Sequence, residues 1–109
     1  MSNDTDAVEP ADERTNRILA VLHLVGPGEV VTYGDVAADA GYPKQSRLVG
    51  RILATTDADV PWWRVVNAAG RLVPGHEREQ SALLRSEDVE VRGTRVRRAP
   101  HGRFARPAD

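Results

Sequence analysis

The sequence predicts a single α+β domain, mainly helical and winged-helix-like, that combines a helix-turn-helix with short β-hairpins. Its 109 residues suffice for one hydrophobic core of useful size but not for two. Two short helical patterns follow one another across a tight glycine-containing turn, which is typical of a helix-turn-helix. Short β-prone pieces surround Gly70 and Gly93. We expect a folded body over residues 11–99, a disordered acidic tail over residues 1–10 and a frayed tail over residues 100–109.

The first helix is predicted from apolar residues that recur along one helical face. The spacing i, i+3, i+4, i+7 is that of an amphipathic helix, and it is followed by Ile18, Val21, Leu22 and Val25. Acidic residues in the first turn suit the positive end of the helix dipole. The Gly26-Pro27-Gly28 turn then ends the helix.

The helix-turn-helix is predicted from a capping box and a second amphipathic pattern. Thr32 stands three residues before Asp35, so Thr32 can cap a helix while the Asp35 carboxylate reaches back to its backbone. This helix ends at Gly41, and its predicted core residues are Val36, Ala37 and Ala40. The second helix is expected over residues 44–54, and its apolar side consists of Leu48, Val49, Ile52 and Leu53.

The second half of the chain predicts two hairpins that flank one helix. Residues 55–60 are expected to form a loop. Residues 64–67 and 71–73 predict a small hairpin around Gly70, and residues 89–91 and 94–96 predict another around Gly93. Between them a helix is expected over residues 77–86, with Ala82 and Leu83 as its core residues.

Composition excludes several classes of function. The chain has no cysteine, and therefore no disulfide, no thiolate metal site and no thiol nucleophile. Its three histidines show no ligand spacing, so we expect neither a metal nor a cofactor. No apolar stretch is long enough to cross a membrane and the N-terminus is polar, which favours a cytoplasmic protein.

The net charge of −1 conceals an uneven distribution. Five of the 16 acidic residues precede Arg14, so 11 remain against all 15 basic residues over the rest of the chain. A basic body with an acidic tail suits contact with phosphates, although a solvated charged surface would give the same count.

Three motifs carry a resemblance to a known family. They resemble, in order and spacing, the DNA-binding domain of O6-alkylguanine-DNA alkyltransferases, and the similarity runs from about Thr15 to Val96. The motifs are Tyr33-Gly34-Asp35-Val36-Ala37, Ser46-Arg47-Leu48-Val49-Gly50 and Pro61-Trp62-Trp63-Arg64-Val65-Val66-Asn67.

The third motif departs from the active enzymes at the residues that perform the chemistry. Active alkyltransferases have Pro-Cys-His-Arg, where the cysteine accepts the alkyl group, the histidine deprotonates it and a glutamate orients the histidine. Here Trp62 and Trp63 replace the first two, and Glu87, which matches the glutamate, has no histidine to orient. Indole offers an N–H donor but no nucleophile or base. The chain is therefore similar to alkyltransferase-like proteins, which lack the cysteine and usually keep the histidine; Trp63 lines either the pocket or the core.

The resemblance implies two sets of site residues. A lesion pocket would be formed by Tyr33, Pro61, Trp62, Trp63, Arg64, Val65, Arg71 and Glu87. DNA contacts would come from Thr32, Tyr33, Ser46, Arg47, Gly50 and Arg51. Within these sets, Trp62 would be a wall against the extruded base, Arg47 would fill the vacated stack and Tyr33 would crowd a phosphate. The alternatives are an exposed or phosphate-contacting Arg47 and packing of Tyr33 or either tryptophan in the core. Arg64 would tie its loop to neighbouring carbonyls.

The function implied by the resemblance is recognition without repair. The protein would be a non-enzymatic monomer that binds O6-alkylguanine in double-stranded DNA by flipping the nucleotide. It would mark the lesion for nucleotide excision repair proteins, and it would be associated with the nucleoid when bound to DNA. The alternative is a winged-helix DNA-binding regulator that reads an unmodified sequence in the major groove. Two adjacent tryptophans beside the helix argue against that alternative.

Overall fold

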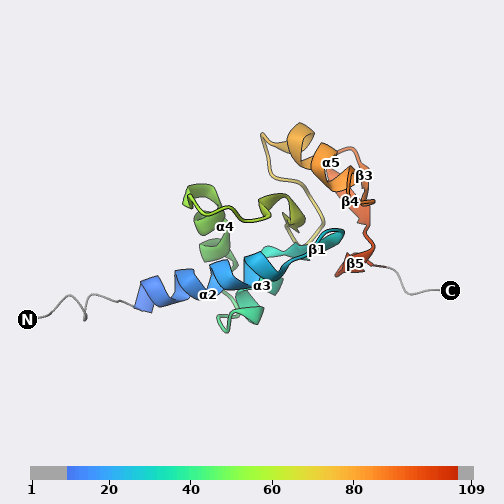
Figure 1. Ribbon diagram of the computed structural model, residues 1–109. Coiled ribbons are helices and arrows are strands. Elements are labelled where there is room, and N and C mark those ends of the chain that lie inside the picture. Colours follow the sequence, from blue (N-terminus) through green and yellow to red (C-terminus); the bar gives the residue numbers. More distant parts are fainter. Residues whose placement is uncertain (1–9, 106–109) are drawn as a thin grey trace, which may run out of the picture.

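The computed structural model describes residues 10–105 and consists of helices and short strands (Figure 1). The helices are α2 (Pro10–Leu24), α3 (Tyr33–Asp39), α4 (Ser46–Thr55) and α5 (Glu77–Arg85), with a 3-10 turn, η1 (Trp62–Arg64). The strands are β1 (Glu29–Thr32), β2 (Val65–Val66), β3 (Glu90–Arg92), β4 (Arg95–Arg98) and β5 (His101–Gly102). The mainly helical α+β class is confirmed, while residues 1–9 of the expected acidic tail lie outside the described residues. Over residues 10–105, no helix combines the length and apolar character needed to cross a membrane.

The predicted capping box starts α3. The backbone N–H of Asp35 donates to the Thr32 hydroxyl at 3.0 Å, and the backbone N–H of Thr32 donates to the Asp35 carboxylate at 3.1 Å. Helix α4, which packs on α3, begins at Ser46 rather than at residue 44. The reason is local: Lys44 has φ +78°, a left-handed conformation that an α-helix excludes. The helix-turn-helix is therefore confirmed, with a shorter second helix.

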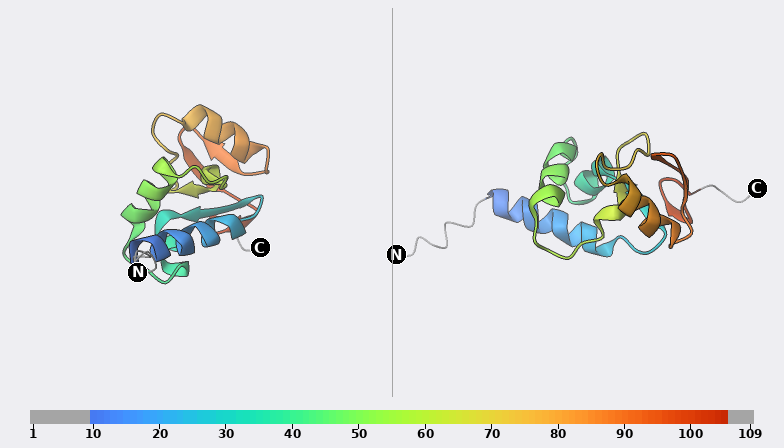
Figure 2. Two further views of the ribbon diagram at one scale, coloured as in Figure 1. Left: turned by 60° about the vertical axis from the view of Figure 1, so that its left-hand side comes forward. Right: turned by 90° about the horizontal axis from the view of Figure 1, so that it is seen from above.

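Two hydrophobic clusters form the core, and strands β1 and β2 contribute to both. Val31 and Val65 belong to the cluster that α2, α3 and α4 form. Val30 and Val66 belong to the cluster under α5 and the β3–β4 hairpin. Adjacent residues of a strand point to opposite faces of the sheet. Val31 and Val65 therefore cover one face of the small sheet, and Val30 and Val66 cover the other. Figure 2 shows this arrangement, with α2 on one side of β1 and α5 with its hairpin on the other.

The hairpin predicted over residues 64–67 and 71–73 is wrong. Val65 pairs in parallel with Val31 of β1, a strand that the sequence did not predict, and Arg71 forms an isolated antiparallel bridge with Arg95. The physical reason is burial: Val65 and Val66 are both fully buried. β2 lies at one edge of the sheet, whose order is β2-β1-β5, and both of its valines are covered, whereas a hairpin at the surface exposes alternate residues.

Two further expectations for the C-terminal half need correction. Helix α5 buries Gln80, Ser81 and Leu84, while Ala82 is exposed and Leu83 is only partly buried. Residues 100–109 do not fray throughout, because β5 pairs with β1 and Phe104 packs on the second cluster; residues 106–109 lie outside the described part. The predicted second hairpin is confirmed, since β3 and β4 pair antiparallel around Gly93.

Candidate nucleic-acid interface

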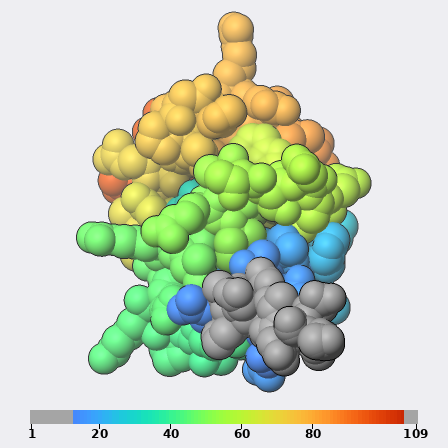
Figure 3. All heavy atoms as spheres, turned by 90° about the vertical axis from the view of Figure 1, so that its left-hand side faces the viewer, coloured from blue at the N-terminus to red at the C-terminus, as the bar shows by residue number. Residues whose placement is uncertain are grey.

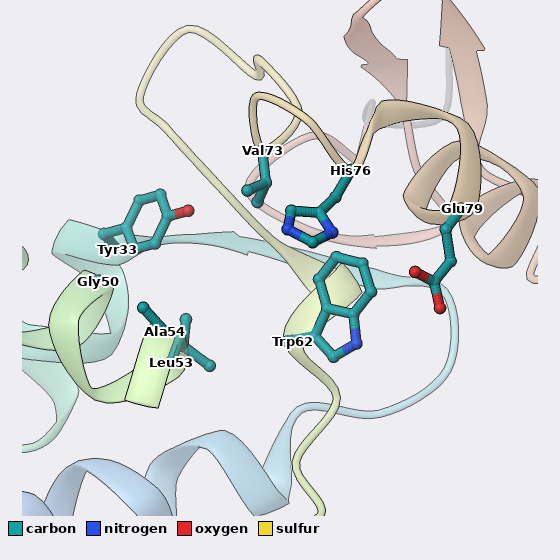
Figure 4. Close-up of a pocket in the computed structure, with 8 residues that line it drawn as sticks. All are labelled: Tyr33, Gly50, Leu53, Ala54, Trp62, Val73, His76 and Glu79. Atoms are coloured by element: carbon teal, nitrogen blue, oxygen red, sulfur yellow. The ribbon is translucent and has the colours of Figure 1, made fainter. Parts of the chain in front are cut away.

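A cleft of about 400 Å³ opens between α4 and the segments that precede and begin α5 (Figure 4). This volume falls within the range of about 300–1,000 Å³ that is usual for small-molecule sites. Most of its lining is apolar or aromatic. The lining residues are Tyr33, Gly50, Leu53, Ala54, Trp62, Val73, His76 and Glu79.

Trp62 forms one wall of the cleft. Its indole is half-buried and lies edge-on to His76, with ring centroids 5.8 Å apart and an interplanar angle of 66°. It also contacts the indole of Trp63 edge-on, with ring centroids 6.2 Å apart and an interplanar angle of 88°. Such T-shaped contacts fix the orientation of aromatic rings. A broad aromatic surface is thereby held facing the cleft, where a planar ligand could stack on it.

The opposite wall comes from α3 and α4. Tyr33 packs against the first cluster yet points its hydroxyl toward the cleft, with Leu53 and Ala54 beside it (Figure 4). A Cβ built on Gly50 would lie 3.9 Å from the Tyr33 ring, so glycine leaves the mouth of the cleft open here. Burial raises the pKa of Tyr33, which keeps its phenol protonated and able to donate a hydrogen bond.

Trp63 turns away from the cleft and toward the protein interior. It packs on the second hydrophobic cluster, and its indole N–H donates to the Glu87 carboxylate at 3.0 Å. The Arg64 guanidinium lies 5.0 Å from the centroid of the Trp63 ring, within cation–π range. The choice left open by the sequence is settled by these contacts: Trp63 belongs to the core side.

Glu87 fixes the loop that carries both tryptophans. Besides the Trp63 N–H, its carboxylate accepts three charged hydrogen bonds from Arg64, at 2.9, 3.2 and 2.7 Å, and one from the backbone N–H of Gly28 at 2.9 Å. Arg64 also donates to the Val25 carbonyl at 2.8 Å, which confirms the predicted tie to a neighbouring carbonyl. Glu87 has no histidine to orient, but it orients Trp63 instead, because the indole N–H donates to its carboxylate.

The charge state of Glu87 follows from these partners. Burial would raise its pKa, but the hydrogen bonds from Arg64, Gly28 and Trp63 and the Arg64 charge outweigh burial and lower it. Both side chains of the Arg64–Glu87 ion pair are 13% exposed. The ionised Glu87 carboxylate therefore stabilises the loop of the two tryptophans. Both of its oxygens already accept hydrogen bonds from Arg64, Gly28 and Trp63.

Comparison with known proteins identifies the family. Residues 13–89 match the family described as 6-O-methylguanine DNA methyltransferase, DNA binding domain. A DNA base-flipping protein of Vibrio parahaemolyticus is 37% identical over 84 residues, which cover 73% of this chain and 84% of the relative. Alkyltransferase-like protein 1 of Schizosaccharomyces pombe is 30% identical over 86 residues, which cover 73% of this chain and 80% of the relative.

The fold of this chain is also similar to that of a solved structure. The crystal structure of S. pombe Atl1 in complex with damaged DNA containing O6-carboxymethylguanine matches with a TM-score of 0.68 and 30% identity, over 76% of this chain and 82% of that one. This chain is an alkyltransferase-like family member. The resemblance inferred from three sequence motifs is thereby confirmed.

The cleft of this alkyltransferase-like chain contains only part of the predicted lesion pocket. Tyr33 and Trp62 line it, and Pro61 lies buried directly before Trp62. Three of the remaining residues do not line the cleft. Val65 is fully buried in β2, and Arg71 is exposed on the loop after β2. The Glu87 carboxylate is hydrogen-bonded to Arg64 and Trp63. The predicted pocket was too wide because Trp62 is the only residue of the third motif that lines the cleft, while Trp63, Arg64 and Val65 turn toward the interior.

The predicted DNA-contact residues are mostly exposed on α4. Ser46, Arg47 and Arg51 are exposed, and Gly50 lines the mouth of the cleft. Thr32 is the exception, because it is 5% exposed and its hydroxyl caps α3. A DNA backbone lying along α4 could therefore reach Arg47 and Arg51 but not the Thr32 hydroxyl.

Five cleft residues were missed by the sequence interpretation. Leu53 and Ala54 follow Gly50 by three and four positions, so helical spacing from Gly50 could have found them. Val73, His76 and Glu79 come from the loop and the first turn of α5, and no local signal marks them as cleft residues. Among residues 10–105, no group of three His, Asp or Glu side chains is placed to hold a metal ion.

Proposed function

We propose that this protein binds O6-alkylguanine in double-stranded DNA, swings the damaged nucleotide into the cleft beside Trp62, and releases it unrepaired. The observation that carries the proposal is the half-buried Trp62 indole, held by His76 and Trp63 as the wall of a base-sized cleft next to α4. Two relatives support the same proposal: one is named a DNA base-flipping protein, and the other was crystallised in complex with damaged DNA.

In the proposed binding reaction, Arg47, Tyr33 and Trp62 have different roles. Arg47, exposed on α4, enters the base stack and hydrogen-bonds the orphaned cytosine, while Tyr33 donates to the phosphate beside the rotated nucleotide. Trp62 then stacks on the extruded base. Stacking contributes about 1–3 kcal/mol, comparable with the few kcal/mol that unstacking costs. O6-alkylation weakens pairing with cytosine, and each buried alkyl CH₂ adds about 0.8 kcal/mol, so the modified base is favoured.

The absence of repair follows from the chemistry of the side chains. The chain contains no cysteine, and the residue at the reactive position, Trp62, has no atom able to accept an alkyl group at neutral pH. Glu87 is hydrogen-bonded to Trp63 and Arg64 and has no histidine to activate. The protein is therefore proposed to be a reversible binder rather than an enzyme.

A reversible binder helps the cell only when another activity removes the lesion. We propose that the protein acts as a monomer on the nucleoid and that its complex recruits nucleotide excision repair proteins. Reconstituted incision of an O6-alkylguanine duplex, with and without this protein, tests the coupling: no increase in incision contradicts it.

The central experiment is a competition between matched duplexes. One contains guanine and the other O6-methylguanine at the same position, and both compete for the protein under the same salt conditions. We expect tighter binding of the modified duplex, quenching of tryptophan fluorescence that Trp62→Phe reduces, and loss of most affinity with Arg47→Ala. Arg17→Ala, a substitution of an exposed arginine on α2, is the matched control. Equal affinities for the two duplexes contradict lesion recognition and favour a winged-helix regulator.

A further inference from the structure

The outer face of the β3–β4 hairpin carries an unusual concentration of arginine. Val91 and Val96 pair across the hairpin and point into the second cluster. The residues on the other side are exposed, and the basic ones are Arg92, Arg95, Arg97 and Arg98, which we call the arginine face. This hairpin follows residue 89, where the match to the family domain ends. None of the three motifs that carry the family resemblance lies in this hairpin.

The charge of the arginine face is largely uncompensated. Arg92 lies 3.5 Å from Glu90 in an exposed pair that contributes little. Arg95, Arg97 and Arg98 form no ion pair with any residue between positions 10 and 105. By contrast, the predicted DNA contacts on α4 include only two arginines. More of the unpaired positive charge thus lies on the hairpin than on α4.

The arginine face is connected to the cleft through the loop that follows β2. Arg71 bridges Arg95 of β4, and Val73, two residues further along this loop, lines the cleft. Figure 3 shows the same order on the surface: the green surface of α4, then the yellow surface of the loop, then orange-red atoms of the residues after position 90 at the same edge. A polyanion lying along α4 and across the cleft therefore continues toward the hairpin.

We propose that the arginine face is a second binding site for DNA phosphates, which holds the flank of the duplex beyond the cleft. The inference rests on the proposed function, because it assumes that duplex DNA occupies α4 and the cleft. Guanidinium groups match phosphate oxygens in a bidentate geometry, and two-stranded ribbons are known to contact DNA. Phosphate contacts carry no sequence or lesion information, so this site adds affinity for damaged and intact duplexes alike.

The test measures how affinity depends on salt. Dissociation constants are determined at several salt concentrations for guanine and O6-methylguanine duplexes, with wild type and with Arg95→Gln/Arg97→Gln. Each phosphate contact adds about 0.9 to the slope of log K against log salt, so the variant should lose about 1.8. At 0.1 M salt, one decade below 1 M, this slope loss corresponds to roughly 60-fold weaker binding of both duplexes, with lesion preference unchanged. Shortening one flank of the duplex, and not the other, should abolish the difference between variant and wild type.

Two controls separate charge from folding. Arg95→Lys/Arg97→Lys keeps the charge and should restore most of the slope. Arg17→Gln removes one exposed charge from α2 and is the control for a charge lost elsewhere. In the right-hand view of Figure 2, α2 and the loop of residues 67–76 lie on opposite sides of the molecule. If Arg95→Gln/Arg97→Gln changes the affinity and the salt slope no more than Arg17→Gln does, the inference is overturned. The arginine face would then be assigned to contact with an acidic protein surface. A loss confined to the damaged duplex overturns it too.

The outcomes also distinguish this inference from the proposed function. A wild type that binds both duplexes equally, while Arg95→Gln/Arg97→Gln lowers the salt slope, contradicts lesion recognition but supports the phosphate site. A wild type that prefers the damaged duplex, while the variant keeps the full slope, supports recognition and overturns the phosphate site.

Discussion

Replacement of Gln80 by methionine is expected to destabilise the fold and to loosen the cleft. Gln80 is fully buried at the start of α5. Its side-chain oxygen accepts from the Val73 N–H at 2.7 Å, and its amide nitrogen donates to the carbonyls of Trp63 and Val65 at 3.1 and 3.2 Å. One side chain therefore joins the loop that carries Val73 to the loop that carries the tryptophans.

The magnitude follows from these three hydrogen bonds. Methionine has nearly the same length and volume as glutamine, so the Gln80→Met substitution leaves no large cavity and the loss is mainly polar. A hydrogen bond contributes about 1 kcal/mol net, and a buried N–H without a partner costs about 1–3 kcal/mol. We expect the free energy of unfolding to fall by about 3 kcal/mol. For a domain of this size that corresponds to a fall in Tm of roughly 12–24 °C.

Urea unfolding followed by far-ultraviolet circular dichroism measures this loss directly. Arg78→Met is the matched control, because Arg78 is exposed on the same helix and its replacement should change stability by less than about 0.5 kcal/mol. A loss below about 1 kcal/mol for Gln80→Met would refute the reasoning, since Val73, Trp63 and Val65 would then find other partners at little cost. Affinity for an O6-methylguanine duplex should fall together with stability, because Val73 lines the cleft.

Three further substitutions test other parts of the fold. Gly102→Ala should lower stability by more than about 1–2 kcal/mol, because φ is +85° and a Cβ would lie 2.5 Å from the Val30 carbonyl; Gly26→Ala, with no atom within 4 Å, should not. The lowered pKa of Glu87 stabilises the fold above its unfolded value near 4.5, and this contribution is lost as pH falls through the folded value. Glu87→Gln should accordingly flatten the loss of Tm between neutral pH and strong acid; an unchanged profile contradicts this. Thr32→Ala should cost about 1 kcal/mol in thermal unfolding while Thr32→Ser retains the cap, and equal losses would argue against the capping role.

Local signals made most helices predictable. The capping box at Thr32 and the amphipathic spacing of Ile18 and Leu22 act within a few residues, so the sequence contains the whole cause of these elements. The sheet is different. Val31 pairs with Val65, and Glu29 pairs with His101, so the partner that makes each segment a strand lies far away along the chain. No short window contains that information.

The candidate site divides in the same way. Tyr33, Gly50 and Trp62 were predicted because the family motifs contain them, and all three line the cleft. The motif could not say which neighbours turn inward, and the placement of Trp63 depends on Glu87 from another element. His76 was missed for a related reason: its position depends on how the loop from β2 returns to α5.

The central place of β1 bears on the order in which the chain folds. Residues 29–32 leave the ribosome long before residues 101–102, whereas the contacts among α2, α3 and α4 are closer in sequence. The helical subassembly can consolidate early, and the seam between β1 and β5 closes late, because distant pairing is slow. Until then β1 offers unsatisfied backbone groups to any matching segment. Strand exchange between two molecules is accordingly the expected by-product when the protein is refolded at high concentration.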